Sequence, residues 1–289
     1  MYSAITSLVA LTLSALLLTA PAALSPDTPA PSAQEVQEAR WAGYGEEQRA
    51  FLRTLSTLDH YDETREERYL AYLGSPEWTP EQILRIVNTD NDLTYFDDAV
   101  PADLDAGDLI LVNKYHSLSS GYVPDDLVTV EPAYSNGGKL KSEVNDAYCA
   151  LAEAMYQETG LRLVCVSPYR SYATQRSLYA RYCAQDDAAA ADRYSAHAGY
   201  SEHQTGLALD VTAPGGTLRG FKKTAQYTWM RENAHRFGFI LRYGEGMEYI
   251  TGYMAEPWHY RYVGTEAAAV IYEQGLTFEE YYAYYVAKQ

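Results

Sequence analysis

The spacing of hydrophobic residues predicts helices in the first third of the chain and again near its centre. Apolar residues recur at helical intervals, among many charges, over 35–58 and 63–73. Thr79-Pro80-Glu81 opens a shorter predicted helix that runs to about residue 87. In the segment 139–159 the apolar residues share one helix face: Leu140, Val144, Tyr148, Leu151 and Met155. Gly160 follows directly and is expected to end that helix.

Shorter apolar runs predict strands between these helices. The predicted strands cover 109–113, 127–131, 161–166, 207–210 and 239–241. Three more helices are predicted over 172–184, 186–193 and 224–237, and Thr265 and Thr277 are expected to cap two last ones. Because strands and helices mix without regular alternation, the predicted fold class is α+β, with a small mixed or antiparallel sheet and flanking helices.

The N-terminal segment predicts export. Residues 4 to about 24 carry no charge and are rich in Leu, Ala and Ser, with small residues near Ala23. This pattern predicts a signal peptide over 1–24, although no Lys or Arg precedes Arg40. The stretch is nearly long enough to span a bilayer, so an uncleaved N-terminal anchor is the alternative. We then expect a linker and helical lead-in over 25–90 and one compact domain over 91–289.

Charge and cysteine content exclude several classes of protein. The chain of 289 residues has a formal charge of −17, so nucleic acid and anionic membrane surfaces are poor partners. Membrane contact is expected only through an N-terminal anchor. The three cysteines, Cys149, Cys165 and Cys183, are too few for a four-cysteine zinc site and odd in number for a complete disulfide framework. Cys165 lies in an apolar run and is predicted to be a buried thiol.

Two short runs carry the candidate chemistry. The first is SEHQTGLALD, with His203 and Asp210, and the second is EPWH, with Glu256 and His259. Two histidines and one carboxylate suit a catalytic zinc ion that keeps an open position for water. The remaining carboxylate can act as a general base. The combination predicts zinc-dependent hydrolysis.

Backbone geometry is compatible with this set. In one helix His203 and Asp210 would lie about 10 Å apart along the axis, too far for one ion, but Gly206 permits a turn between them. We therefore expect His203 in a loop and Asp210 at the end of the strand that follows. Pro257 disfavours helical backbone at Glu256, which predicts an irregular corner there and a strand from about His259.

Each of these residues also has an ordinary structural interpretation. His203 could cap a turn, Asp210 could bind neighbouring amides, and Glu256 could pair with Arg261. The two runs occurring together favour the metal site over three separate structural roles. The other histidines are expected to have surface or structural roles: His60, His116, His197 and His235.

A further candidate follows the strand predicted over 161–166. Tyr169-Arg170-Ser171 opens the next helix, and an arginine at such a junction is well placed to meet a carboxylate or an oxyanion. Gln175 lies further along the same helix. The alternative for Arg170 is an ordinary surface turn.

Five segments together resemble the VanY-type D-alanyl-D-alanine carboxypeptidases, a zinc peptidase family that also includes LD-carboxypeptidases. These segments are LVNK at 111–114, YRSY at 169–172 with Gln175, SEHQTGLALD at 201–210, ITGY at 250–253 and EPWHYRYVG at 256–264. They cover about residues 80–265 in the family's order. Ala198 stands where the family often has Pro.

The resemblance implies a role for each site residue. His203, Asp210 and His259 would bind one Zn²⁺, Glu256 would be the catalytic base, and Arg170 would hold the scissile carbonyl or its oxyanion. The substrate pocket would be lined by Gln175, Ser201, Tyr243 and Trp258. The fold would be the small α+β fold that these peptidases share with the hedgehog signalling domain.

The expected function is removal of the terminal D-Ala from peptidoglycan stem peptides by water. We expect a monomer that acts outside the membrane of a bacterium, secreted or associated with the cell wall. One alternative is an LD-carboxypeptidase acting on tetrapeptide stems. Two others are an endopeptidase that cuts cross-links and a non-catalytic module that binds the cell wall.

Overall fold

The computed structural model describes residues 30–287 and divides into two units at Arg49–Ala50. The first unit contains α1 (Ala33–Arg40), capped by Ser32 and Glu35 in a capping box, and a 3₁₀ turn, η1 (Trp41–Gly43). Helix α2 (Glu46–Leu55) begins here and crosses the boundary. The single helix predicted over 35–58 is therefore wrong, because the chain leaves the helix between Trp41 and Gly45.

In the second unit, residues 50–90 form a small helical layer. It contains η2 (Glu63–Arg65), α3 (Glu66–Leu70) and α4 (Pro80–Asn88), and Thr79 caps α4 as predicted. Together with the end of α2, these elements form a cluster of buried side chains: Leu55, Tyr69, Ile83, Leu84 and Val87. Arg85 of α4 pairs with Glu280 near the C-terminus, so this layer is attached to the rest of the unit. The domain boundary at residue 90 stays a prediction.

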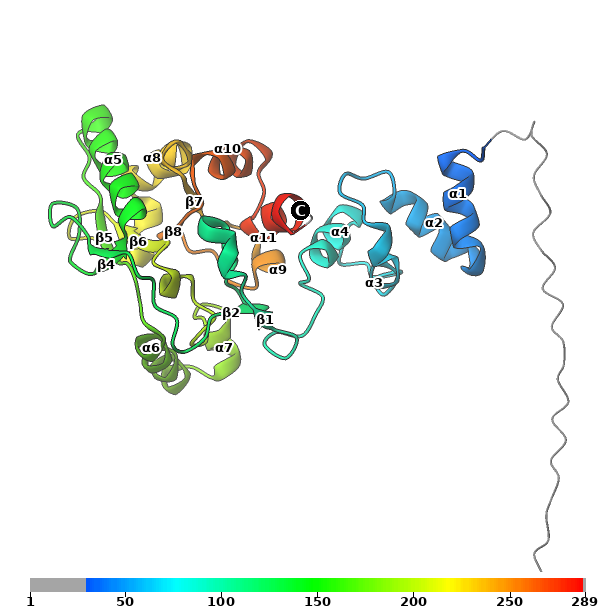
Figure 1. Ribbon diagram of the computed structural model, residues 1–289, viewed down its shortest axis with the longest axis horizontal. Helices are drawn as coiled ribbons and strands as arrows, with labels where there is room; N and C mark the ends of the chain where they lie inside the picture. Colours follow the sequence, from blue (N-terminus) through cyan, green and yellow to red (C-terminus); the bar gives the residue numbers. More distant parts are fainter. Residues whose placement is uncertain (1–29, 288–289) are drawn as a thin grey trace, which may run out of the picture. The chain divides into compact units, whose positions relative to one another are not determined.

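The main sheet is antiparallel and has the strand order β5-β6-β8-β7 (Figure 1). Its strands are β5 (Val164–Ser167), β6 (Ala208–Thr212), β8 (His259–Tyr262) and β7 (Phe239–Leu241). Two smaller ladders pair β1 (Val100–Pro101) with β2 (His116–Ser117) and β3 (Leu127–Thr129) with β4 (Lys139–Lys141). This mixture of helices and small sheets confirms the predicted α+β class.

The strand predicted over 109–113 is wrong. The 3₁₀ segment η3 (Leu104–Leu109) ends there, and the buried residues that follow do not join a sheet. Two carbonyl groups in this stretch, those of Asp108 and Ile110, accept hydrogen bonds from the Arg261 guanidinium. Asn113 then closes a tight turn with His116. The apolar side chains pack inward without strand pairing.

Helices surround the sheet. The longer ones are α5 (Ser142–Thr159), α6 (Tyr172–Gln185), α8 (Ala225–Asn233) and α10 (Thr265–Gln274). The shorter elements are α7 (Ala188–Asp192), η4 (Glu202–Thr205), η5 (Leu218–Lys223), η6 (Ala234–Phe237), α9 (Glu248–Thr251), α11 (Phe278–Tyr281) and the π-helical turn η7 (Tyr282–Val286).

Most of the predicted helix ends are confirmed, with three adjustments. Gly160 ends α5 in the left-handed conformation, and Thr277 caps α11 with Glu280 in a capping box. Helix α5 begins only at Ser142, because residues 139–141 pair with β3. The predicted helix over 224–237 changes into a 3₁₀ turn at Ala234. Gly264, and not Thr265, occupies the cap position of α10.

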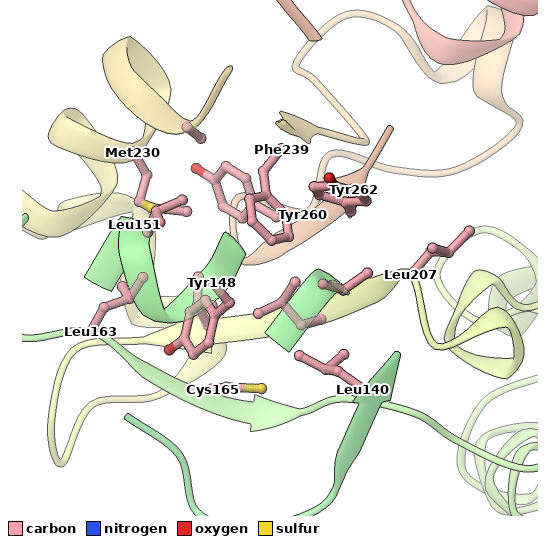
Figure 2. Close-up of a cluster of buried hydrophobic side chains, with 14 of the residues drawn as sticks. Leu140, Tyr148, Leu151, Leu163, Cys165, Leu207, Met230, Phe239, Tyr260 and Tyr262 are labelled. Atoms are coloured by element: carbon pink, nitrogen blue, oxygen red, sulfur yellow. The ribbon is translucent and has the colours of Figure 1, made fainter. Parts of the chain in front are cut away.

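The largest core lies between one face of the sheet and helices α5 and α8 (Figure 2). Alternate strand residues, Leu209 and Val211 of β6 and Tyr260 and Tyr262 of β8, point into it. Figure 2 shows Tyr260 and Tyr262 among side chains of α5 and α8. The alternate positions, Asp210 of β6 and His259 and Arg261 of β8, therefore lie on the opposite face of the sheet.

Two further predictions concern the membrane and the cysteines. Among residues 30–287, no helix combines the length and apolar character needed to cross a bilayer. The predicted signal peptide or anchor over 1–24 lies outside the described residues. All three cysteines are free thiols, and Cys165 is buried as predicted.

Candidate active site

Strand register brings two of the predicted metal ligands together. Asp210 of β6 is paired directly with His259 of β8, and both side chains leave the face of the sheet opposite the core. The sequence had predicted Asp210 at the end of its strand. It is instead the central residue of β6, because the strand continues to Thr212. His259 is the first residue of β8, as expected.

The third residue reaches the same place through a turn. His203 lies in η4, which ends at Gly206 with a φ of 72°, and β6 begins two residues later. A left-handed residue at this position reverses the chain, so that His203 folds back over the strand carrying Asp210. The predicted loop position of His203 and the role of Gly206 are confirmed by this geometry.

The three side chains present their ligand atoms to a common point. Asp210 Oδ1 lies 3.4 Å from His203 Nε2 and 3.2 Å from His259 Nδ1. One ligand atom from each of the three residues lies within 4.8 Å of the others, and all three residues are buried. Asp210 Oδ1 is buried without a hydrogen-bond partner among the described residues. A buried carboxylate oxygen without a partner is costly, and a cation at this point would satisfy it.

The other nitrogen of each imidazole ring is already bound. His203 Nδ1 lies 2.9 Å from the carbonyl oxygen of Pro168, and His259 Nε2 lies 3.4 Å from Glu202 Oε2. A metal-binding histidine usually donates its second N–H to a carbonyl or a carboxylate, which fixes the tautomer and the ring orientation. Both rings therefore have the arrangement of metal ligands.

Electrostatic effects on the three residues agree with this arrangement. Burial and the nearby Arg170 lower the pKa of His203, which favours the neutral form that binds metals. Although burial opposes ionisation, His203 and His259 hold the pKa of Asp210 well below its usual range. His259 behaves differently: despite burial, Asp210 and Glu202 raise its pKa to about 9. Because a histidine binds a metal in its neutral form, a divalent cation at this point would favour the neutral imidazole of His259.

Glu256 lies at the predicted corner just before β8. Its N–H donates to the carbonyl of Tyr243, and its own carbonyl accepts from the His259 N–H. This turn places Glu256 Oε2 3.6 Å from His259 Nδ1, on the side of the cluster that faces the cavity. Burial raises the pKa of Glu256 to about 8. The carboxylate does not pair with Arg261, which was the alternative interpretation, because Arg261 binds Glu202.

Arg170 lies between β5 and α6, and its guanidinium is held in place. Nη1 donates to Gln175 Oε1 and Nη2 donates to Ser167 Oγ, each at 2.7 Å. Nη2 also lies 3.7 Å from Asp210 Oδ2. The Arg170 N–H donates to the carbonyl of His203, which connects this loop to the turn that carries His203. The guanidinium is therefore oriented before any ligand binds, and Arg170 is not a free surface residue.

All the predicted site residues line one cavity of about 750 Å³. Tyr243 forms part of its wall, with its ring centroid 5.0 Å from that of His259. Gln175 is buried, and its amide accepts from Arg170 and donates to the Ala196 carbonyl, so it holds the Arg170 guanidinium in place. Ser201 and Trp258 also line the cavity. The roles of these four residues toward a substrate stay predictions.

The sequence interpretation missed the buried charges behind His259. Glu202 Oε1 accepts hydrogen bonds from Arg242 Nε at 2.7 Å and Arg261 Nη1 at 3.0 Å, and none of these three side chains is exposed. Although burial opposes it, the two arginines hold the pKa of Glu202 well below its usual range. Glu202 could have been recognised in the sequence as a candidate partner of the site, because it directly precedes His203. Arg242 is far away in sequence, and nothing there pointed to it.

Comparison with known proteins agrees with this site. Residues 137–265 match the family model "VanY: D-alanyl-D-alanine carboxypeptidase". A D-alanyl-D-alanine carboxypeptidase of Enterococcus faecalis (strain ATCC 700802 / V583) is 38% identical over 182 residues, which are 60% of this chain and 65% of that protein. The bifunctional D-Ala-D-Ala dipeptidase and carboxypeptidase VanXYC of Enterococcus gallinarum is 35% identical over 181 residues, which are 61% of this chain and 94% of that protein.

Solved structures show the same likeness. The LD-carboxypeptidase LdcB superposes with a TM-score of 0.60 and 37% identity, over 66% of this chain and 93% of that one. A second structure is the D,D-pentapeptidase VanY of a VanB-type vancomycin resistance cassette, solved as a single-site mutant with Zn(II). It superposes with a TM-score of 0.52 and 38% identity, over 60% of this chain and 98% of that one. The chain belongs to the VanY family of D-alanyl-D-alanine carboxypeptidases.

Proposed function

We propose that this protein is a zinc-dependent D-alanyl-D-alanine carboxypeptidase that removes the terminal D-Ala from peptidoglycan stem peptides. The observation that supports it most is the convergence of His203 Nε2, Asp210 Oδ1 and His259 Nδ1, with Glu256 beside them in one cavity. Because the chain spans 65% of the length of its E. faecalis relative, the activity of that whole protein is carried over here as part of the proposal.

The ligand set favours zinc. Two histidines and one carboxylate with both second ring nitrogens bound are a typical catalytic zinc set, which leaves a position open for water or substrate. The related VanY protein solved with Zn(II) supports the same metal. When bound, zinc would lower the pKa of a water molecule and polarise a carbonyl group.

Glu256 is proposed as the general base and acid. Its Oε2 would accept a proton from the water that attacks the scissile carbonyl, and it would then deliver that proton to the nitrogen of the leaving D-Ala. Glu256 must be ionised to begin, and the positive charge of a bound divalent cation favours that form. Since water is the nucleophile, the reaction needs no serine and forms no acyl-enzyme.

Arg170 is proposed to stabilise negative charge on the oxygen of the scissile carbonyl. Its guanidinium is fixed by Gln175 and Ser167 and lines the cavity next to Asp210. Donors that are oriented in advance lose little free energy to reorganisation when charge develops, so they stabilise the transition state more than the substrate. Ser201, Tyr243 and Trp258 would contact the peptide.

The second candidate is an LD-carboxypeptidase that acts on tetrapeptide stems, and the structural likeness to LdcB favours it. A non-catalytic module that binds the cell wall would not require the complete set of ligands and base. The likeness to peptidoglycan-acting proteins also supports export to the cell surface or the medium, where we propose that the protein acts as a monomer.

The test is a direct comparison of substrates. Purified protein loaded with zinc is incubated with a pentapeptide stem that ends in D-Ala-D-Ala and with a tetrapeptide stem, and products are identified by mass spectrometry. We expect loss of one D-Ala from the pentapeptide at the higher kcat/KM. Faster cleavage of the tetrapeptide would establish the LD specificity, and no cleavage of either would contradict the proposal.

A further inference from the structure

A buried carboxylate outside the region that matches the family model reaches toward the metal site. Glu279 belongs to α11, beyond residues 137–265, and its side chain is 2% exposed. Its Oε2 accepts from Arg242 Nη1 at 2.8 Å, and its Oε1 accepts from Arg242 Nη2 at 2.5 Å. Paired bonds of this kind fix both the position and the plane of the guanidinium.

Arg242 passes this restraint on to a metal ligand. The guanidinium that binds Glu279 through its two terminal nitrogens donates from Nε to Glu202 Oε1 at 2.7 Å. Glu202 Oε2 in turn lies 3.4 Å from His259 Nε2. The contacts therefore run from α11 through Arg242 and Glu202 to the imidazole whose Nδ1 faces the metal position.

The charges in this cluster balance. Two carboxylates, Glu202 and Glu279, face two guanidinium groups, Arg242 and Arg261, and all four side chains are excluded from solvent. The ring of Phe278 lies beneath both guanidinium groups, at 5.5 Å from Arg242 and 4.8 Å from Arg261. Removing one carboxylate would leave an uncompensated positive charge, and a buried unpaired charge forces its neighbours to rearrange.

We propose that Glu279 is a positioning residue for the metal site, acting through Arg242 and Glu202 on His259. This proposal rests on the proposed function, because it requires His259 to bind the metal. With Glu279 in place, Arg242 is satisfied on three nitrogens, and Glu202 can direct one oxygen to His259. Without it, Arg242 would compete for both oxygens of Glu202, and His259 would lose the partner that orients its ring.

The neighbouring residue Glu280 provides a matched control. It lies on the same short helix, is also 2% exposed, and binds an arginine through both of its oxygens, with Arg85 Nε at 2.5 Å and Nη2 at 2.9 Å. Arg85 belongs to α4, and its guanidinium binds Glu280, Tyr249 and Met247, none of which belongs to the metal site. A substitution that acts only by destabilising α11 should therefore have the same effect at Glu279 as at Glu280.

The experiment compares Glu279→Gln with Glu280→Gln in the full chain. Zinc affinity is measured by competition with a chromophoric chelator, and the free energy of unfolding is measured by urea denaturation in EDTA. We expect E279Q to bind zinc about tenfold more weakly than the wild type, the low end of the range for outer partners of metal ligands. We expect E280Q to lose stability but to bind zinc as the wild type does. With zinc in excess, KM for the peptide should be unchanged in E279Q, because Glu279 does not line the cavity.

Equal zinc affinity in the two variants would overturn the proposal. If E279Q cannot be purified in folded form, Glu279→Asp and Glu280→Asp are compared in the same titration. The shorter side chain keeps the charge but cannot hold both Arg242 nitrogens from the same backbone position, so E279D alone should bind zinc more weakly. A wild-type protein that binds zinc but cleaves no peptide would contradict the proposed function, while the comparison of zinc affinities would still decide the role of Glu279.

Discussion

The turn at Gly206 gives a quantitative test of how the sequence builds the site. Gly206 lies between His203 and Asp210 with a φ of 72°, and an added Cβ would lie 3.0 Å from Leu127 Cδ2 and 3.2 Å from Lys141 Cγ. A left-handed conformation costs a residue with a Cβ about 1–2 kcal/mol. Crowding in a packed region adds about 1–3 kcal/mol. Gly206→Ala should therefore lower the free energy of unfolding by about 2–5 kcal/mol.

Gly215→Ala is the matched control. Gly215 also has a positive φ, of 69°, but an added Cβ there would meet nothing within 4 Å. Only the conformational cost of about 1–2 kcal/mol should remain. Both variants are unfolded in urea, in the presence of EDTA, and followed by far-ultraviolet circular dichroism. If G206A is no more destabilised than G215A, close packing around this turn is not what fixes the position of His203.

Three further predictions concern the metal and the chemistry. Glu256→Gln should keep its zinc but lose about 10²- to 10⁴-fold in kcat, because an amide cannot accept the proton, and metal analysis with steady-state kinetics checks this. Arg170→Lys should lower kcat more than it raises KM, because Lys keeps the charge but loses the planar fork. Unchanged kcat and KM in that variant would mean that another group stabilises the oxyanion. His203→Ala should lose most of its bound zinc, whereas His197→Ala, whose imidazole pairs with Asp192, should retain it; equal zinc contents would contradict the ligand assignment.

The parts of the site that sequence could predict are those set by local chain geometry. Gly206 indicated the turn that returns His203 to the strand, and Pro257 indicated the corner that carries Glu256. Short spacings within one motif limit where side chains can go, so the candidate metal ligands and the candidate base could be named from two runs of residues. The confirmed cap at Thr277 is another local feature of this kind.

Features that depend on distant contacts could not be predicted in this way. The apolar run 109–113 has the composition of a strand, but the carbonyl of Ile110, like that of Asp108 just before the run, accepts from Arg261 far along the chain. Asp210 was placed at a strand end because the run of apolar residues stops there, whereas pairing with β5 extends the strand to Thr212. The cluster of Arg242, Glu202 and Glu279 exists only because three separate segments meet behind His259.

The most direct test of the central claim is a titration of peptidase activity with zinc. Protein stripped of metal is given increasing Zn²⁺, and hydrolysis of a peptide ending in D-Ala-D-Ala is measured at each addition. The proposed site predicts no activity before addition, a linear rise, and a break at one zinc per chain, with E256Q inactive throughout although it binds the same amount. Activity in the stripped protein, or equal activity in E256Q, would contradict zinc-dependent hydrolysis with Glu256 as the base.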